Sequence, residues 1–341
     1  MFPSVQSSFS RYYTLMRHRV ENILLIASPY DRFILEEDGQ LSERLFTEYL
    51  TLNLSRHPRF NLVTNMDDAM RSLAEAPCDL AIIAAHHLGM HPTEAAQAIK
   101  AVMPELPVVM MTYDRTSAQA YAELGSESGL DGVYLWSGDP QLMLAVLKCV
   151  EDRINAPRDT RKALVRVIIL VEDSPAFYSA YLPTIWTEVI TQTRSLTSQG
   201  LNDVHGRYRA WARPKVLHAR TYEEATSLIE RFEPYLIGVI TDVRFPVGGS
   251  LNPNAGWDLV KFIRKRKGDL PILMQSAEGE HALSASRMGI AFVDKTSPRL
   301  LTALREFMSN SMGFGPFIFR MKDRRGVARA SDPHQLLTIL E

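Results

Sequence analysis

The stretch Val165–Asp173, VRVIILVED, contains an apolar run that ends abruptly in two acidic residues. Valine, isoleucine and leucine without an interrupting turn residue are typical of a short strand buried on both faces of a parallel sheet. Ligands of such sheets gather at the carboxyl ends of the strands. Glu172 and Asp173 therefore mark the edge at which we expect a functional site.

Seven further apolar runs of this kind occur along the chain. Amphipathic stretches rich in alanine, leucine and glutamate separate them, and this alternation predicts parallel α/β sheets covered by helices on both sides. We expect the other strands at Ile23–Ala27, Leu80–Ala85, Val108–Thr112, Val133–Leu135, Leu236–Thr241, Ile272–Ser276 and Ala291–Val293. The clearest helices are expected at Thr93–Met103, Gln141–Ile154, Tyr222–Phe232, Trp257–Lys267 and Pro298–Met308.

The order of strands and helices occurs twice. Leu106-Pro107 precedes one strand as Leu270-Pro271 precedes another, and Asp139-Pro140 opens one helix as Ser297-Pro298 opens its counterpart. A repeat of this length is far too long for a solenoid unit. The chain is therefore predicted to hold two copies of one α/β domain in tandem.

We place the two copies at residues 20–154 and 165–310, and interpret the polar residues 155–164 between them as a linker because NAPRDTRK contains a proline and no apolar run. Residues 1–19 form an amino-terminal arm with Phe9, Tyr12, Tyr13 and Met16 at helical spacing. This arm is expected to be a short helix packed on the first domain, or a dimerisation arm.

Two further segments lie outside the regular pattern. The expanded stretch Pro183–Pro214 fits either an extended first helix with a long return loop or a dimerisation or partner-binding element. Residues 311–341 form a carboxy-terminal extension, whose basic run Arg320–Arg329 is interpreted as a hairpin or solvated turn. This extension is too short for a helix-turn-helix output module, so we expect no direct DNA binding.

Composition excludes several classes of protein. The chain of 341 residues has 38 Lys and Arg against 39 Asp and Glu, so its net charge of −1 gives no general case for binding nucleic acid or an anionic membrane. No run approaches the apolar length of a membrane helix, and the amino end does not resemble a secretory signal. Two cysteines cannot form a disulfide framework, which favours the cytoplasm.

Polar residues in the second copy follow or end its strands. Glu172 and Asp173 follow one strand, Asp242 another, Ser276 ends a third, and Lys295 follows the last. Clustered carboxylates raise one another's pKa unless a cation compensates them, and Mg²⁺ prefers such oxygen ligands. A carboxylate nucleophile, a divalent cation and a lysine are what phosphoryl transfer to a carboxylate requires.

The second copy resembles the receiver domain of bacterial two-component response regulators. The resemblance rests on four motifs, VEDS at 171–174, TDVRFP at 241–246, MQSAE at 274–278 and FVDK at 292–295. It implies a flavodoxin-like doubly wound sheet in each copy, with strand order 2-1-3-4-5. It also implies that a sensor histidine kinase or phosphotransfer protein donates a phosphoryl group.

The resemblance implies a role for each matching residue. Asp242 would be the phosphoacceptor, with Lys295 contacting the phosphoryl group. Ser276 would be the hydroxyl switch, and Phe292 its aromatic partner. The Mg²⁺ ligands would be Glu172, Asp173, Asp242 and the backbone carbonyl of Val243. The protein would then be a signalling phosphoacceptor that loses its phosphoryl group slowly, not a metabolic enzyme.

The first copy lacks these groups. Our sequence alignment of the two copies places Ala27-Ser28 opposite Glu172-Asp173, Ala85 opposite Asp242, Ser137 opposite Lys295, Thr112 opposite Ser276 and Tyr134 opposite Phe292. The first copy is therefore predicted to be a degenerate pseudo-receiver that serves in packing, dimerisation or relay. His86, His87 and His91 could bind a transition metal, although solvated loop histidines are the simpler interpretation.

The layout of the whole chain, from RYYTLMRHRVENILLIASPYDRF through FGPFIFR to RASDPHQL, has a second resemblance. It is similar to the amino-terminal region of bacterial proteins in which paired receiver-like domains precede a phosphoenolpyruvate-synthase-like region of the pyruvate/phosphate dikinase type. This implies that residues from Phe314 onward begin a downstream region. The alternative function is then a non-phosphorylated tandem that docks or regulates that region. We expect a homodimer in either case.

Overall fold

The computed structural model describes residues 14–38, 40–52, 54, 57–84, 90–197, 211–314, 317–320 and 326–330. The chain divides into two compact units. The amino-terminal unit consists of residues 16–155 and 173–183. The carboxy-terminal unit consists of residues 156–172 and 184–341, together with residues up to 15.

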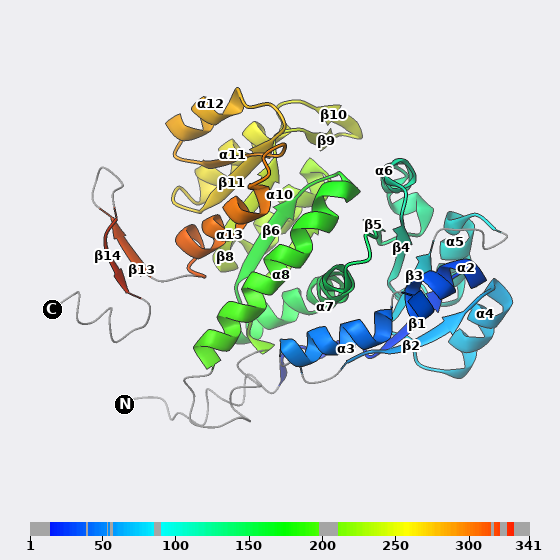
Figure 1. The fold of residues 1–341 in the computed structure, drawn as a ribbon. Helices are drawn as coiled ribbons and strands as arrows, with labels where there is room; N and C mark the ends of the chain where they lie inside the picture. The colour runs from blue at the N-terminus through cyan, green and yellow to red at the C-terminus, as the bar shows by residue number, and fades with distance from the viewer. Residues whose placement is uncertain are drawn as a thin grey trace. The chain divides into compact units, whose positions relative to one another are not determined.

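The amino-terminal unit contains a parallel five-stranded sheet with the order β2-β1-β3-β4-β5 (Figure 1). Its strands are β1 (Asn22–Ile26), β2 (Arg59–Val63), β3 (Leu80–Ala84), β4 (Val108–Thr112) and β5 (Gly132–Leu135). The connecting helices are α2 (Pro29–Arg32), the π-helix η2 (Phe33–Asp38), α3 (Leu41–Thr51), α4 (Met66–Glu75), α5 (Pro92–Val102), α6 (Arg115–Glu123) and the 3₁₀ turn η3 (Gly125–Ser128).

The carboxy-terminal unit repeats this arrangement, with the order β7-β6-β8-β11-β12, of which Figure 1 labels β6, β8 and β11. Its strands are β6 (Val167–Val171), β7 (Lys215–Ala219), β8 (Leu236–Asp242), β11 (Ile272–Ser276) and β12 (Ala291–Asp294). Its helices include α10 (Tyr222–Phe232), the 3₁₀ turn η4 (Glu233–Tyr235), α11 (Ala255–Arg266), α12 (His281–Arg287) and α13 (Leu300–Ser311).

Both sheets have the strand order 2-1-3-4-5, so the chain is a tandem of two flavodoxin-like receiver folds. This confirms the predicted fold class. The eight predicted strands are all present, with ends that differ by no more than two residues from the prediction. Strands β2 and β7 were not predicted, and both are edge strands, each paired to a single neighbour.

The central strands are buried because helices cover the sheet. Every residue of β6 is buried, and its valines and isoleucine pack with α10 and α11 in one continuous core. The core residues contributed by those helices include Ile229, Phe232, Leu259 and Ile263. Strands of this kind must be apolar on both faces, which is why the run Val167–Val171 contains no polar residue.

The stretch interpreted as a linker is helical. Residues 155–162 belong to α7 (Pro140–Ala163), which continues through Pro157. Side chains on one face of this segment are buried, including Ala156 and Asp159. Asp159 pairs with Lys215 of β7 at 3.0 Å, and both side chains are fully buried. The polar residues that suggested a loop therefore form the anchored end of a helix.

Several irregular segments correct or refine the sequence analysis. Of the predicted arm, residues 1–13 lie outside the described residues, and Met16 has a left-handed backbone with φ 50°, so a helix does not include it. The first part of the insertion, residues 183–197, continues α8 (Pro175–Thr197), in agreement with an extended first helix, and residues 198–210 lie outside the described residues. The loop after Asp242 forms an antiparallel pair, β9 (Phe245–Val247) and β10 (Ser250–Asn252).

The carboxy-terminal extension contains a second antiparallel pair, β13 (Phe317–Arg320) and β14 (Gly326–Ala330). This agrees with the hairpin interpretation of the basic run. Among the helices that the structure describes, none combines the length and the apolar character needed to cross a bilayer.

The buried pair of Asp159 and Lys215 gives the first prediction. Replacing one partner removes the opposite charge that lies 3.0 Å from the other, so Lys215→Met should lower the free energy of unfolding by about 3–5 kcal/mol. Replacing both, with Asp159→Leu added, should recover much of that loss. Chemical denaturation measures both effects.

The matched control is Lys261→Met, which breaks a pair with Asp258 that has the same 3.0 Å separation but lies exposed on α11. Exposed pairs contribute little, so this variant should change stability by no more than about 1 kcal/mol. Equal effects of the Lys215 and Lys261 variants would contradict the argument.

Candidate functional site

The polar residues predicted to form a site lie at the carboxyl edge of the second sheet. Asp242 is the last residue of β8, and Ser276 the last residue of β11. Glu172 directly follows β6, and Lys295 directly follows β12. The four strands are neighbours and parallel, so their carboxyl ends meet at one edge. The topology alone thus brings residues from four separate parts of the sequence together.

Lys295 is the centre of this cluster. Its Nζ donates to Asp242 Oδ2 at 2.6 Å and lies 2.7 Å from Glu172 Oε2. All three side chains are largely or fully buried. Burial by itself lowers the pKa of the Lys295 ammonium, but the Glu172 and Asp242 carboxylates outweigh burial, and the pKa is raised above its usual value. Lys295 therefore carries a full positive charge at neutral pH.

The carboxylates of Glu172, Asp173 and Asp242 form a compact acidic group. Each offers an oxygen, and these oxygens all lie within 4.8 Å of one another. Hard divalent cations bind several carboxylate oxygens at such sites, and Mg²⁺ commonly takes one or two carboxylates while keeping some of its waters. The donor set is of a kind that fits Mg²⁺, and binding of the cation stays a prediction. The predicted fourth ligand, the Val243 carbonyl, accepts a hydrogen bond from Gly256 N at 2.8 Å and has a second lone pair.

The backbone around Asp242 is fixed on both sides. Val243 N donates to Asp242 Oδ1 at 2.7 Å, and Thr241 Oγ1 donates to the Asp242 carbonyl at 2.9 Å. The amino end of α11 approaches this segment closely at Gly256. A Cβ atom at position 256 would lie 2.3 Å from the Asp242 carbonyl oxygen and 2.8 Å from Val243 Cα. Only glycine fits there without moving the backbone that carries Asp242.

Ser276 and Phe292 are the predicted switch pair. Ser276 is buried, and its Oγ accepts a hydrogen bond from Glu278 N at 3.0 Å. Phe292 is partly buried against the core and lies opposite Met274 in the register of β11 and β12. Their positions are compatible with the predicted roles, which stay predictions.

Three residues that contact the site did not stand out in the sequence. Gln275 Nε2 donates to Glu172 Oε2 at 2.9 Å, and His218 Nε2 donates to the Glu172 carbonyl at 2.8 Å. The third is Gly256. Only Gln275 left a signal that could have been used, because it is a polar residue inside an otherwise apolar run, ILMQS.

The register of the two sheets shows which residues of the first copy are equivalent to the site. Thr112 and Ser276 end equivalent strands. Thr112 lies opposite Leu135 and Ser276 opposite Asp294, so the residues that follow, Trp136 and Lys295, are equivalent. The residues before them, Met111 and Gln275, are equivalent as well. Met111 pairs with Ala84 and Gln275 with Asp242, so Ala84 is the counterpart of Asp242.

These equivalences correct the sequence alignment, which named Ser137 and Ala85 instead. The counterpart of Phe292 is Val133 and not Tyr134. Each correction is one residue, because short strands were aligned by composition without knowledge of their partners. The matches of Ala27 and Ser28 to Glu172 and Asp173 are supported by the register.

The hydroxyl at the end of the fourth strand makes the same contact in both copies. Asp114 N donates to Thr112 Oγ1 at 3.2 Å, as Glu278 N does to Ser276 Oγ. The first copy thus keeps the local backbone design of the site. The positions equivalent to its carboxylates and lysine hold Ala27, Ser28, Ala84 and Trp136. None of these side chains can supply a carboxylate nucleophile or a cationic partner.

Of the three clustered histidines of the first copy, the structure describes only His91. His86 and His87 lie outside the described residues. His91 Nδ1 lies 2.7 Å from Thr93 Oγ1, and its Nε2 lies 3.2 Å from the Tyr121 hydroxyl. Both ring nitrogens are therefore engaged with hydroxyl groups, one at the start of α5 and one in α6.

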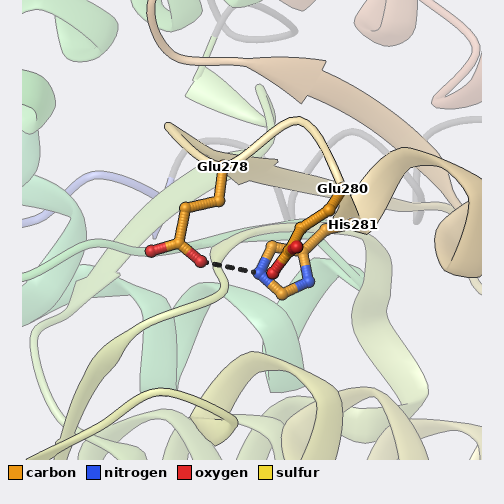
Figure 2. Close-up of side chains that lie close together, drawn as sticks. All are labelled: Glu278, Glu280 and His281. Carbon is orange, nitrogen blue, oxygen red and sulfur yellow. Dashed lines mark ion pairs between the residues drawn. The ribbon is translucent and has the colours of Figure 1, made fainter.

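A second cluster of ionisable residues lies on the loop after Ser276. Figure 2 shows Glu278, Glu280 and His281, whose ligand-type atoms lie within 4.8 Å of one another. His281 Nε2 is 3.4 Å from Glu278 Oε2, and its ring contacts the Trp257 ring with 5.9 Å between centroids. These contacts join α12 to α11 beside the site, and Glu278 and Glu280 are exposed to solvent.

Comparisons with known proteins show weak similarity to solved structures. No model of a known family matches the chain, and no curated protein matches it. Two structures described as two-component system response regulator/GGDEF domain proteins have 16% identity and a TM-score of 0.34, over 84% of this chain and 98% or 99% of theirs. The transcription regulator CcpA of Lactococcus lactis has 10% identity and a TM-score of 0.24, over 92% of this chain and 99% of its own.

At these values the likenesses carry no functional conclusion, and the fold is assigned from strand order and register. The resemblance to proteins with a phosphoenolpyruvate-synthase-like region receives no support from any of the comparisons.

The close approach at Gly256 gives the second prediction. In an ordinary helix, Gly→Ala is stabilising, because alanine has the higher helix propensity. Here the clash with the Asp242 carbonyl should dominate, and Gly256→Ala should destabilise the protein by about 1–3 kcal/mol. Gly268→Ala is the matched control, since a Cβ atom there meets nothing within 4 Å. Denaturation midpoints compare the two, and a Gly256→Ala variant as stable as the wild type would refute the clash.

Proposed function

We propose that this protein is a response regulator of two-component signal transduction, in which the carboxy-terminal unit accepts a phosphoryl group on Asp242. The observation that carries the proposal is the arrangement of Lys295. Its ammonium lies between Asp242 and Glu172, beside the third carboxylate, Asp173. A buried lysine between carboxylates at the edge of a receiver fold is what acyl phosphate formation requires.

The proposed reaction is a displacement at phosphorus. A carboxylate oxygen of Asp242 attacks the phosphorus of a phosphohistidine in a sensor histidine kinase or phosphotransfer protein. The new O–P bond forms as the N–P bond breaks, and the released imidazole takes up a proton from solvent. The Lys295 ammonium then passes from the carboxylate oxygen to a phosphoryl oxygen, where it balances part of the added charge.

A divalent cation would be held by Glu172, Asp173, Asp242 and the Val243 carbonyl. Mg²⁺ at this position would neutralise the negative charge that develops on the transferred phosphoryl oxygens. Without such compensation the incoming phosphoryl group would meet three carboxylates and be repelled. Ser276 would then turn its hydroxyl toward the phosphoryl group, and Phe292 would change its position with it. A partner protein would recognise this new position of Phe292.

We assign the first copy a role in relay. Helix α8 begins two residues after Asp173, and its first turns belong to the amino-terminal unit. There the Tyr178 hydroxyl donates to the Val133 carbonyl, and Leu135 N donates to Ser179 Oγ at 3.0 Å. Tyr178 also makes an edge-on ring contact with Tyr134. A movement of Asp173 on phosphorylation would therefore be transmitted to β5 through the first turns of α8. That the protein acts as a homodimer stays a prediction.

Phosphorylation is tested by incubation with Mg²⁺ and acetyl phosphate. The wild type should gain the mass of one phosphoryl group, which hydroxylamine removes because it is an acyl phosphate. Asp242→Asn and Asp242→Ala should abolish the gain. Asp258→Asn, at an exposed aspartate of α11, is the matched control and should keep it. A wild type without an Asp242-dependent mass increase would overturn the proposed function.

The relay is tested by amide hydrogen exchange. Mg²⁺ with beryllofluoride, an analogue of the phosphoryl group, should change the exchange rate of the Leu135 amide, which is bonded to Ser179. Asp242→Asn should remove this response, and Tyr178→Phe should reduce it without preventing phosphorylation of Asp242. The Ile82 amide, in the buried centre of the same sheet, serves as the internal control. An unchanged Leu135 rate in a phosphorylation-competent protein would exclude the relay.

A further inference from the structure

We infer that Gln275 is a positioning residue of the acidic site, which holds the Glu172 carboxylate in place for a divalent cation while Lys295 exchanges its contacts. The inference rests on the proposed function of that site. Nothing in the receiver resemblance assigned a role to this position, which lies directly before the predicted switch residue Ser276.

The main chain of Gln275 is fixed by its neighbours on both sides. It lies opposite Asp242 in β8 and opposite Val293 in β12. Its carbonyl accepts a hydrogen bond from Val243 N at 3.0 Å. Gln275 is 2% exposed, and its side chain donates to Glu172 Oε2 at 2.9 Å. One residue therefore touches both the backbone segment of Asp242 and the carboxylate of Glu172.

Glu172 needs such a contact more than the two aspartates do. Its side chain has one more methylene and one more rotatable bond than aspartate, so its carboxylate can adopt more positions. Holding a ligand in one position before the cation arrives lowers the entropic cost of binding. The Glu172 main chain is already held, because Glu172 N donates to the Ala219 carbonyl and His218 donates to the Glu172 carbonyl. Gln275 extends this constraint to the carboxylate.

The neutral charge of the amide matters as much as its position. Glu172 Oε2 accepts from both Lys295 Nζ and Gln275 Nε2. An ammonium so close to a ligand oxygen repels an incoming divalent cation, whereas a neutral amide does not. Lys295 can move to a phosphoryl oxygen in the proposed reaction, but Gln275 is anchored in the middle of the sheet. Gln275 is therefore the donor that can keep Glu172 in place in every state of the site.

The test is Mg²⁺ binding measured by titration calorimetry on the full chain. Gln275→Met keeps the length of the side chain and removes the donor, and it should weaken Mg²⁺ affinity about tenfold, as loss of an outer partner of a metal ligand typically does. Gln119→Met is the matched control. It removes a hydrogen bond of the same type, from Gln119 Nε2 to Glu123 Oε1 at 3.0 Å, far from the site in sequence and in the other unit. It should leave Mg²⁺ affinity unchanged.

A double-mutant cycle separates positioning from a merely structural role. Glu172→Asp withdraws the carboxylate from Gln275 by one methylene, so the hydrogen bond is lost before Gln275 is changed. In that background Gln275→Met should cause no further loss of Mg²⁺ affinity. A general packing defect would weaken binding equally in both backgrounds. If Gln275→Met does not fold, Gln275→Asn, whose amide is too short to reach Glu172, replaces it in the cycle.

The outcomes distinguish the inference from the function on which it rests. A wild type that does not bind Mg²⁺ would overturn both. A wild type that binds Mg²⁺ and accepts a phosphoryl group, with Gln275 variants that bind equally well, would overturn only the role of Gln275. Equal losses in the wild-type and Glu172→Asp backgrounds would also overturn it, because they would show that the residue acts through packing.

Discussion

The site at the carboxyl edge of the second sheet depends on the buried ammonium of Lys295, which lies between two buried carboxylates. Glu172 and Asp242 lie on adjacent strands, and without Lys295 their charges would oppose the folding of the edge that carries them. Lys295 makes that edge stable in the absence of a cation. The same two carboxylates are the nucleophile and a metal ligand of the proposed reaction. Stability and the proposed reactivity thus depend on the same three residues.

The remainder of the site is a consequence of strand order. The carboxyl ends of four adjacent parallel strands must meet, so residues separated by up to 123 positions in the sequence, from Glu172 to Lys295, become neighbours. Two uncharged residues then fix the positions of Asp242 and Glu172. The amino end of α11 approaches the Asp242 backbone at Gly256, and Gln275 reaches Glu172 from the middle of the sheet. Gly256 and Gln275 are both uncharged, and each of them contacts a charged residue of the site.

Much of this could be predicted from the sequence, and the failures have physical reasons. Buried strands were found because they must be apolar on both faces, whereas β2, RFNLV, alternates and is half exposed at a sheet edge. β7 contains Lys215, whose buried ammonium pairs with Asp159 of α7, so a charge interrupts the apolar pattern by which the other strands were found. Asp159 also belongs to the polar stretch 155–164, which was taken for a linker because the partner of this buried charge lies far away in the sequence.

One-residue errors at Ala84 and Trp136 arose because register depends on partner strands, which composition does not reveal. Gln275 was missed because its polar side chain in the buried strand ILMQS does not show which distant residue it contacts.

Trp136 in the place of the lysine has a consequence for how the two copies can change over time. The positions equivalent to Glu172, Asp242 and Lys295 hold Ala27, Ala84 and Trp136, all of them buried. A single substitution that restored one charge would bury it without a partner, which destabilises a fold strongly. Reversal would need several coordinated substitutions, each unfavourable alone. The uncharged edge of the first sheet is therefore separated from the charged edge of the second by several unfavourable substitutions, and selection on stability alone would keep the two copies distinct.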